Sequence, residues 1–245
     1  MAGNYHSAKP LGKGIGQFGL TFSTTRYEKV TTDSDTGQTT RDSVVLPNLI
    51  PEITYHLGVN DDVDVGGRVA LGSLGLEADV KYRFLRSDKL HLAVAPALGY
   101  LAFVVVQGVS GRLPGILTYE LGDNLDLNLA AFVSTTKFST AGSDSNDFNV
   151  FSGTLLSSGG AVGFDLHGET FNIRPTVEFT RYLYNFSSGD SSTSDGFNTV
   201  NIMVHIAWTI GKEKQQLNRI ENKLDQMNPP PPGPPPPPPP EPSRM

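Results

Sequence analysis

The stretch from Leu74 to Phe84, LGLEADVKYRF, decides the fold because apolar and charged side chains alternate along it. In a β-strand, successive side chains point to opposite faces, so this alternation gives one apolar and one charged face. The apolar face carries Leu76, Ala78, Val80, Tyr82 and Phe84, and the charged face carries Glu77, Asp79, Lys81 and Arg83. The stretch is therefore predicted to be a strand that separates two very different environments.

The same two-residue period recurs along the chain and predicts about ten strands. The run from Val200 to Ile210 is as clear as the first example, with an apolar residue at every even position. Tight turns are expected at 60–62, 86–89, 122–124 and 167–170. The other connections are expected at 29–43, 72–75, 106–112, 134–153 and 185–196. Short turns on one side and longer polar loops on the other are typical of an all-β, closed, antiparallel, up-and-down transmembrane β-barrel.

The charged face is assigned to the barrel interior and the apolar face to lipid. A hairpin around 72–75 then pairs Arg68 with Asp79 and Asp64 with Arg83. Unlike charges placed directly opposite each other stabilise a sheet by roughly 0.2–1 kcal/mol. The predicted lumen charges are Asp64, Arg68, Glu77, Asp79, Lys81, Arg83, Arg174 and Glu178, and Glu52 is a candidate for the same set.

Aromatic residues on the apolar face lie near strand ends, as expected for side chains at a membrane–water interface. The predicted interface aromatics are Tyr82, Phe84, Phe164, Phe171 and Trp208. The longest apolar run, Leu92 to Val106, is shorter than the roughly 20 residues of a membrane helix and contains Pro96. A strand is therefore favoured there over a single transmembrane helix.

Composition excludes several classes of function. The formal net charge of −6 argues against a nucleic-acid partner, because an excess of cations would be needed to neutralise phosphates. The absence of cysteine removes disulfides, thiolate metal sites and cysteine nucleophiles. Residues 1–16 contain no apolar segment of the kind a secretory signal needs, so the chain is interpreted as a mature form.

Motifs with a chemical interpretation are each assigned a structural role. The glycines Gly12, Gly14 and Gly16 do not follow a strand, so they are interpreted as flexible entry into the barrel and not as a phosphate loop. Residues 60–64 lack the spacing of a calcium-binding EF-hand loop and are interpreted as a polar turn.

The histidines give no enzymatic site at the loop side of the predicted barrel, where proteolytic barrels carry Asp and His. His56, His91 and His167 are expected near the turns, His205 in the turn-side half of the last strand, and His6 outside the barrel. A general base must lie near its substrate. No enzymatic activity, catalytic residue, cofactor or metal is therefore predicted.

After the last strand the sequence period changes. Residues 212–228 are predicted to form a short amphipathic helix with one apolar stripe, Leu217, Ile220, Leu224 and Met227. Two interpretations stay open, namely association through the 212–227 helix, with a second copy or a partner helix, and a marginal helix under the barrel. Residues 229–245 are rich in proline and are predicted to be a polyproline II spacer, which is favoured over a ligand for a groove in a partner protein.

Residues Lys13 to Gly211, with their strand pattern, turn asymmetry and closing Trp208-Thr209-Ile210, resemble the small outer-membrane β-barrel proteins of Gram-negative bacteria. Such barrels commonly end at the last strand, whereas this chain continues to Met245. The resemblance implies an outer-membrane location, contact with lipid, and both termini in the periplasm. The expected organisation is a periplasmic stub (1–12), the barrel (13–211), the helix (212–228) and the tail (229–245).

The leading hypothesis for function is a structural or interaction protein. Its helix and proline-rich spacer would reach a periplasmic partner protein or the peptidoglycan of the cell wall. The first alternative is a narrow pore for ions or small solutes, porin-like and tuned by the lumen charges. The second is a soluble, ligand-binding β-barrel with its apolar face inward.

Overall fold

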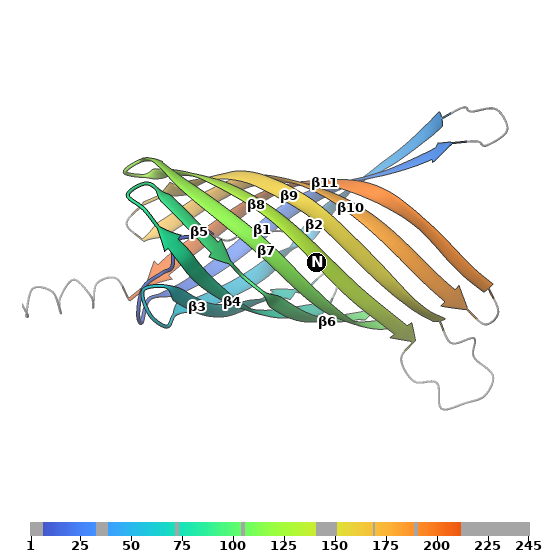
Figure 1. The fold of residues 1–245 in the computed structure, drawn as a ribbon, viewed down its shortest axis with the longest axis horizontal. Coiled ribbons are helices and arrows are strands. Elements are labelled where there is room, and N and C mark those ends of the chain that lie inside the picture. The colour runs from blue at the N-terminus through green and yellow to red at the C-terminus, as the bar shows by residue number, and fades with distance from the viewer. Residues whose placement is uncertain are drawn as a thin grey trace, which may run out of the picture. The chain divides into compact units, whose positions relative to one another are not determined.

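The computed structural model describes residues 7–32, 39–71, 74–103, 106–140, 151–168, 170–188 and 191–211. These residues form eleven strands, each antiparallel to the strands it pairs with (Figure 1). The strands are β1 (Gly16–Thr32), β2 (Thr39–Gly58), β3 (Val63–Ala70), β4 (Gly75–Arg86), β5 (Leu90–Val94), β6 (Ala97–Phe103), β7 (Val106–Gly122), β8 (Leu125–Thr140), β9 (Phe151–His167), β10 (Phe171–Ser188) and β11 (Ser191–Ile210). In the described part of the chain, no helix has the length and apolar character needed to cross a bilayer.

The sheet closes on itself because the first strand pairs with the last. β1 pairs with β2 on one side and with β11 on the other. β5 and β6 each pair with both β4 and β7, so together they fill one place in the wall, and the eleven strands occupy ten places. Pro96 separates the two halves because it has no N–H to donate to a neighbouring strand. The prediction of a closed antiparallel barrel of about ten strands is confirmed.

The two faces of the wall differ as the alternation predicted. Along β4 every second side chain is buried, and Val80 and Tyr82 are 47% and 50% exposed on the outside. Ile202 and Trp208 on β11 are likewise exposed, at 60% and 43%. An apolar outer face around a charged interior is the arrangement of a barrel that spans a membrane. It contradicts the soluble alternative, which required the apolar face to be inside.

The two ends of the barrel differ in how the strands finish there. At the end we call the turn end, short connections such as 59–62, 87–89 and 123–124 join the strands. At the opposite end, the loop end, β1 and β2 (Figure 1, blue) and β10 and β11 (orange) run on beyond the short strands β3, β4 and β6.

Four of the connections expected at the loop end are strand wherever the structure describes them. Residues 106–112 belong to β7, and the described parts of the stretches 29–43, 134–153 and 185–196 are likewise strand. These Ser- and Thr-rich stretches lose the apolar–polar alternation, as expected where a strand has left the apolar belt and meets water on both faces.

The register of the β3–β4 hairpin differs by two residues from the predicted one. Arg68 lies opposite Glu77 and Asp64 opposite Lys81, where Asp79 and Arg83 were expected. The error preserved the inward face because side chains alternate with a period of two. Alternation alone therefore identified the face but not the partner.

The chain divides into two units, Met1–Ile210 and Gly211–Met245. The predicted helix at 212–228, its stripe (Leu217, Ile220, Leu224 and Met227) and the proline-rich tail at 229–245 lie outside the described residues.

Candidate functional site in the barrel interior

The structure places all eight predicted lumen charges inside the barrel. None is more than 9% exposed, and Glu52 from β2 joins them at 6%. They are Asp64 and Arg68 on β3, Glu77, Asp79, Lys81 and Arg83 on β4, and Arg174 and Glu178 on β10. The charged residues of each strand lie an even number of positions apart, so their side chains point to the same face. Each strand therefore presents its ionised side chains to the same enclosed space.

A four-residue ion network links β2, β3, β4 and β7 inside the lumen. The Arg68 guanidinium lies 3.0 Å from Glu77 and 3.4 Å from Glu52. Arg112 of β7 reaches the other oxygen of Glu77 at 2.8 Å. Two guanidinium groups thus neutralise two carboxylates, as buried charges require. Arg112 was missed from the sequence because residues 106–112 were expected to form a loop.

Residues 7–15, which precede β1, run through the barrel interior apart from the exposed Lys13 and Gly14, and do not lie outside it as a stub. Ala8 is fully buried in a cluster with Ala93, Ala95 and Ile116. Its backbone N–H donates to Thr118 Oγ1 at 2.8 Å. The small side chains of Ala93 and Ala95 leave the space that this segment fills. The expectation of a periplasmic stub at 1–12 is therefore corrected for residues 7–12.

Two glycines shape the path of this segment. Gly12 and Gly14 have φ of 89° and 75°, in the left-handed region that glycine enters without strain. The N–H of Ile15 donates to the Gly12 carbonyl at 3.1 Å, and the N–H of Gly14 donates to the Gly58 carbonyl at 2.8 Å. The chain thus turns against β2 before it enters β1. Their role is this specific turn, and not the general flexibility expected from the sequence.

The lumen charges hold the N-terminal segment in place. The Asp64 carboxylate accepts the backbone N–H of Leu11 at 3.1 Å. The Lys81 ammonium lies 2.7 Å from Asp64 and donates to the Lys9 carbonyl at 2.8 Å. One buried ion pair therefore contacts the inserted segment through both of its members. We call residues 7–15 the plug.

The Lys9 side chain connects the plug to a cluster of acidic residues at the turn end. Its ammonium lies 2.8 Å from both Asp126 of β8 and Glu120 of β7. Partial burial opposes the charged form, but hydrogen bonds to these two carboxylates outweigh it and raise the pKa of Lys9 above its usual value. Lys9 is therefore charged at neutral pH.

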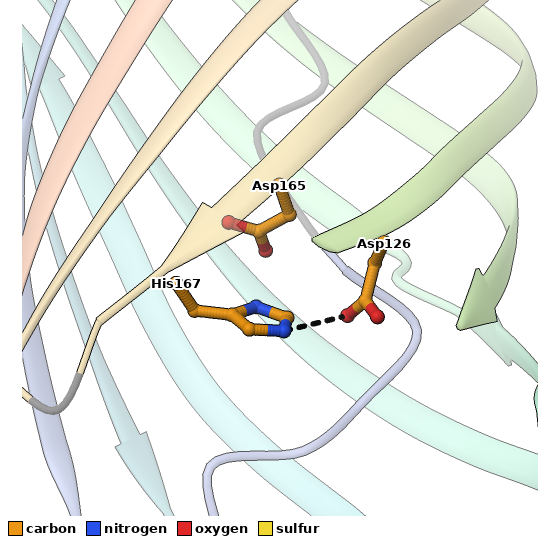
Figure 2. Close-up of side chains that lie close together, drawn as sticks. All are labelled: Asp126, Asp165 and His167. Carbon is orange, nitrogen blue, oxygen red and sulfur yellow. Dashed lines mark ion pairs between the residues drawn. The ribbon is translucent and has the colours of Figure 1, made fainter. Parts of the chain in front are cut away.

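Asp126 also belongs to a group that the sequence analysis did not foresee. Asp126 and Asp165 lie directly opposite each other on β8 and β9, and their ligand atoms lie within 4.8 Å of each other and of His167 (Figure 2). The His167 Nε2 is 3.6 Å from Asp126. Like charges placed opposite each other are destabilising unless cations lie beside them.

The cations beside this group are protein side chains. Lys9 pairs with Asp126, and Arg174 of β10 pairs with Asp165. The two cations balance the charges of the group, which therefore fits an anchor for the plug. The prediction that the chain has no metal-binding residue stays a prediction. The signal in the sequence was the inward position of Asp126 and Asp165, but their pairing depends on the register between β8 and β9.

The other histidines also lie in the interior. His56 Nε2 is 3.1 Å from Asp79, and His91 Nε2 is 2.9 Å from Glu120. His205 Nδ1 is 2.8 Å from the Thr21 hydroxyl. His6 lies outside the described residues. Each described histidine thus has a partner inside the wall.

The loop half of the lumen differs from the plugged half. It contains a cavity of about 80 Å³, lined in part by Phe132, Ser157, Glu178 and Tyr182. The Glu178 carboxylate accepts hydrogen bonds from Asn201 Nδ2 at 3.0 Å and from Thr180 Oγ1 at 3.2 Å. Its second oxygen is buried and has no hydrogen-bond partner.

The five predicted interface aromatics lie on the outer face at the turn end. Each side chain is 43–55% exposed, and the five residues are Tyr82, Phe84, Phe164, Phe171 and Trp208. Trp208 lies between the facing positions of β1 and β10, opposite Phe18 and Phe171, and its ring centroid is 6.3 Å from that of Phe18. The arrangement is that of a partial aromatic girdle, and its depth in a membrane stays a prediction.

Comparison with known proteins finds similarity in structure and none in sequence. No protein-family model matches the chain, and no curated protein is similar to it in sequence. The outer membrane protease OmpT from Escherichia coli matches with a TM-score of 0.41 and 9% identity, over 81% of this chain and 97% of that chain. The outer membrane protein OprG from Pseudomonas aeruginosa matches with a TM-score of 0.36 and 13% identity, over 84% and 99%. Ail, the attachment invasion locus protein of Yersinia pestis, matches with a TM-score of 0.30 and 14% identity, over 81% and 99%. These three matches are outer-membrane β-barrels, the class that the sequence resembles.

Proposed function

We propose that this chain is an integral outer-membrane β-barrel with a structural or interaction role, and that ions and solutes cannot pass through its interior from one end to the other. The observation that carries the proposal is the plug. Residues 7–15 occupy the turn half of the lumen, and Asp64, Lys81 and Asp126 hold them through hydrogen bonds and ion pairs. The network of Arg68 and Glu77 crosses the lumen beyond it. A ten-stranded barrel filled in this way has little room left for a water-filled path.

Planar-bilayer recording on the purified full-length protein tests the closed interior. We expect no unitary current steps at any voltage, with a wide porin in the same bilayers as the positive control. Stepwise conductance that is altered by Lys81→Met or by Lys9→Met would overturn the closed lumen and favour the alternative of a narrow pore.

We propose that the turn end faces the periplasm and the loop end the cell exterior. Supporting this, barrels of the outer membrane carry short periplasmic turns and longer extracellular parts. β1 begins and β11 ends at the turn end, so the wall of the barrel starts and finishes on the side that we assign to the periplasm.

The absence of cysteine makes the orientation testable. Asp42→Cys lies on the extended loop-end part of β2, and Asp123→Cys lies in an exposed turn at the other end. A membrane-impermeant maleimide should label Asp42→Cys in intact cells and Asp123→Cys only after the cells are opened. The reverse pattern would invert the proposed orientation.

We propose further that residues 212–245 extend the protein towards a periplasmic partner or the peptidoglycan, with the proline-rich part as a spacer. The support is chemical: a polyproline II segment spans roughly 3.1 Å per residue and needs no packed core. Deletion of 212–245 should leave the barrel folded and abolish crosslinking of the full-length protein to periplasmic material. Unchanged crosslinking would contradict this role.

No enzymatic role is proposed. The support is the placement of the described histidines, which lie inside the wall with carboxylate or hydroxyl partners. A hydrolytic assay on surface-displayed protein, with Asp79→Asn and Asp126→Asn as variants, should give no activity that depends on either residue. Activity lost in one variant would identify a catalytic group.

A further inference from the structure

Glu178 is a buried carboxylate without a compensating cation in the described interior. Its exposure is 1%, and its two hydrogen-bond donors, Asn201 and Thr180, are neutral. The oxygen Oε2 is buried and unpartnered. A carboxylate removed from water requires a counter-charge or a proton, because its desolvation is otherwise unfavourable by several kcal/mol. The other lumen carboxylates described above meet this need with Lys, Arg or His.

The cavity of about 80 Å³ places Glu178 next to the ion network, because Glu77 and Arg112 also line it. Arg112 and Arg68 lie 2.8 Å and 3.0 Å from Glu77. Among the described residues, no Lys, Arg or His forms an ion pair with Glu178, whose Oε2 has no hydrogen-bond partner. The cavity therefore offers a carboxylate oxygen to a cation.

The wall above Glu178 is aromatic. Tyr182, Tyr184 and Phe186 follow Glu178 on the same face of β10, at intervals of two residues. Phe197 of β11 stacks on Tyr182 with a centroid distance of 4.8 Å, and Tyr27 of β1 lies 6.0 Å from Phe197. We call these five residues the aromatic column. Tyr27 is 39% exposed, so the column extends from solvent at the loop end towards the buried carboxylate.

An aromatic lining that ends in a carboxylate is chemically complementary to a cation carried on an apolar chain. The π faces of Tyr and Phe attract cations as well as apolar chains, and the carboxylate binds the charged head by a charge-assisted hydrogen bond. A cavity of about 80 Å³ has room for roughly two or three water-sized groups, since a water takes up about 30 Å³. An ammonium head with its first methylene groups fits this volume, and the rest of an apolar chain fits along the aromatic column.

We infer that Glu178, the cavity and the aromatic column form a binding site for a primary ammonium group carried on a short apolar chain. The site opens towards the loop end and is closed below by the ion network and the plug. It is thus a blind cup, and ligand binding there requires no passage through the barrel. The inference goes beyond the proposed structural role and does not depend on residues 212–245.

The test is calorimetric titration of the detergent-solubilised full-length protein with n-butylammonium chloride. n-Butanol and sodium butyrate serve as neutral and anionic probes of similar size. Binding of n-butylammonium, at least about tenfold tighter than either of the other probes, is expected because charge and apolar chain must both be recognised. Equal binding of n-butanol would overturn the role of the carboxylate, and no detectable binding of n-butylammonium would overturn the site.

Variants locate the binding. Glu178→Gln should weaken n-butylammonium binding at least about thirtyfold, because it removes one partner of a buried charge pair. Tyr182→Leu should weaken it about threefold, because the cation–π contribution is smaller. The matched control is Glu28→Gln, which removes a carboxylate from β1 that pairs with Arg26 outside the cavity. Heat-modifiable gel mobility establishes that each variant is folded.

Two results with folded variants would refute the inference. One is an affinity in Glu178→Gln that equals that of the parent protein. The other is a loss in Glu28→Gln as large as that in Glu178→Gln, which would indicate non-specific attraction to the acidic surface. Failure of the conductance or crosslinking experiments would leave this result unaffected, so the site and the proposed function are tested separately.

Discussion

Replacing Lys81 by methionine tests whether buried ion pairs hold the plug and stabilise the barrel. The Lys81 ammonium lies 2.7 Å from Asp64, and the two side chains are 7% and 1% exposed. It also donates to the Lys9 carbonyl at 2.8 Å. Methionine keeps the length and apolar character of the lysine stem but removes the charge and the donor. The substitution therefore leaves the buried Asp64 carboxyl group without its paired ammonium.

The expected cost follows from burial. Removing one partner of a buried ion pair destabilises a protein by about 3–5 kcal/mol, far more than the loss of an exposed pair. Asp64 retains the hydrogen bond from the Leu11 N–H, so we expect the lower part of that range, about 3 kcal/mol. At 1.4 kcal/mol for each factor of ten, the equilibrium constant for unfolding should rise roughly a hundredfold.

Urea unfolding in lipid vesicles, followed by heat-modifiable gel mobility, measures this free energy. The control is Lys89→Met, in an exposed turn, which should change stability by less than about 0.5 kcal/mol. The double variant Asp64→Asn, Lys81→Met should be more stable than Lys81→Met alone, because no buried charge is left over. A loss within about 0.5 kcal/mol for Lys81→Met would refute the reasoning, since the lumen would then behave as solvent.

Three further predictions concern the wall itself. Trp208 is the single tryptophan and is exposed on the outer face, so brominated phospholipids should quench its fluorescence, and a lack of quenching would contradict its lipid contact. Ile202→Arg should lower the free energy of unfolding in vesicles by about 2–4 kcal/mol, and Ile210→Arg, at the end of β11, should lower it by about 0–1 kcal/mol. Equal losses in the two variants would contradict an apolar belt whose effect depends on depth. Gly66→Ala should cost about 1–3 kcal/mol in the same assay, because its Cβ would lie 2.0 Å from the His56 ring and 2.5 Å from the Tyr55 carbonyl oxygen, and an unchanged stability would show that the wall yields there.

The strands of the barrel wall could be predicted directly from the alternation of apolar and polar residues. Residues 76–84 alternate between exposed and buried as the pattern required, because a single strand there faces lipid on one side and charge on the other. Where that contrast disappears, prediction failed. Residues 134–140 and 185–188 are strand, but their polar composition is that of a loop, since composition reports the environment and not the backbone.

The interior was predictable as a set of residues but not as a set of pairs. Alternation assigned Asp64 and Glu77 to the lumen, yet their partners depend on register, and a shift of two residues preserves the face. The juxtaposition of Asp126 and Asp165 also depends on register. The plug gave no periodic signal, because residues 7–15 are ordered by contacts with residues distant in the sequence, from Asp64 to Thr118.

The pairing of Gly16 to Glu28 with β11 has a consequence for how the molecule is made. The ring cannot be completed until its final strand has been synthesised, and before that moment two bare strand edges are available to any other extended chain. Insertion of the plug is also coupled to closure of the barrel. The plug must either be inside when β1 pairs with β11 or be threaded in afterwards. Assembly should therefore be all-or-none, and a truncation within β11 should yield an aggregation-prone open sheet in place of a smaller barrel.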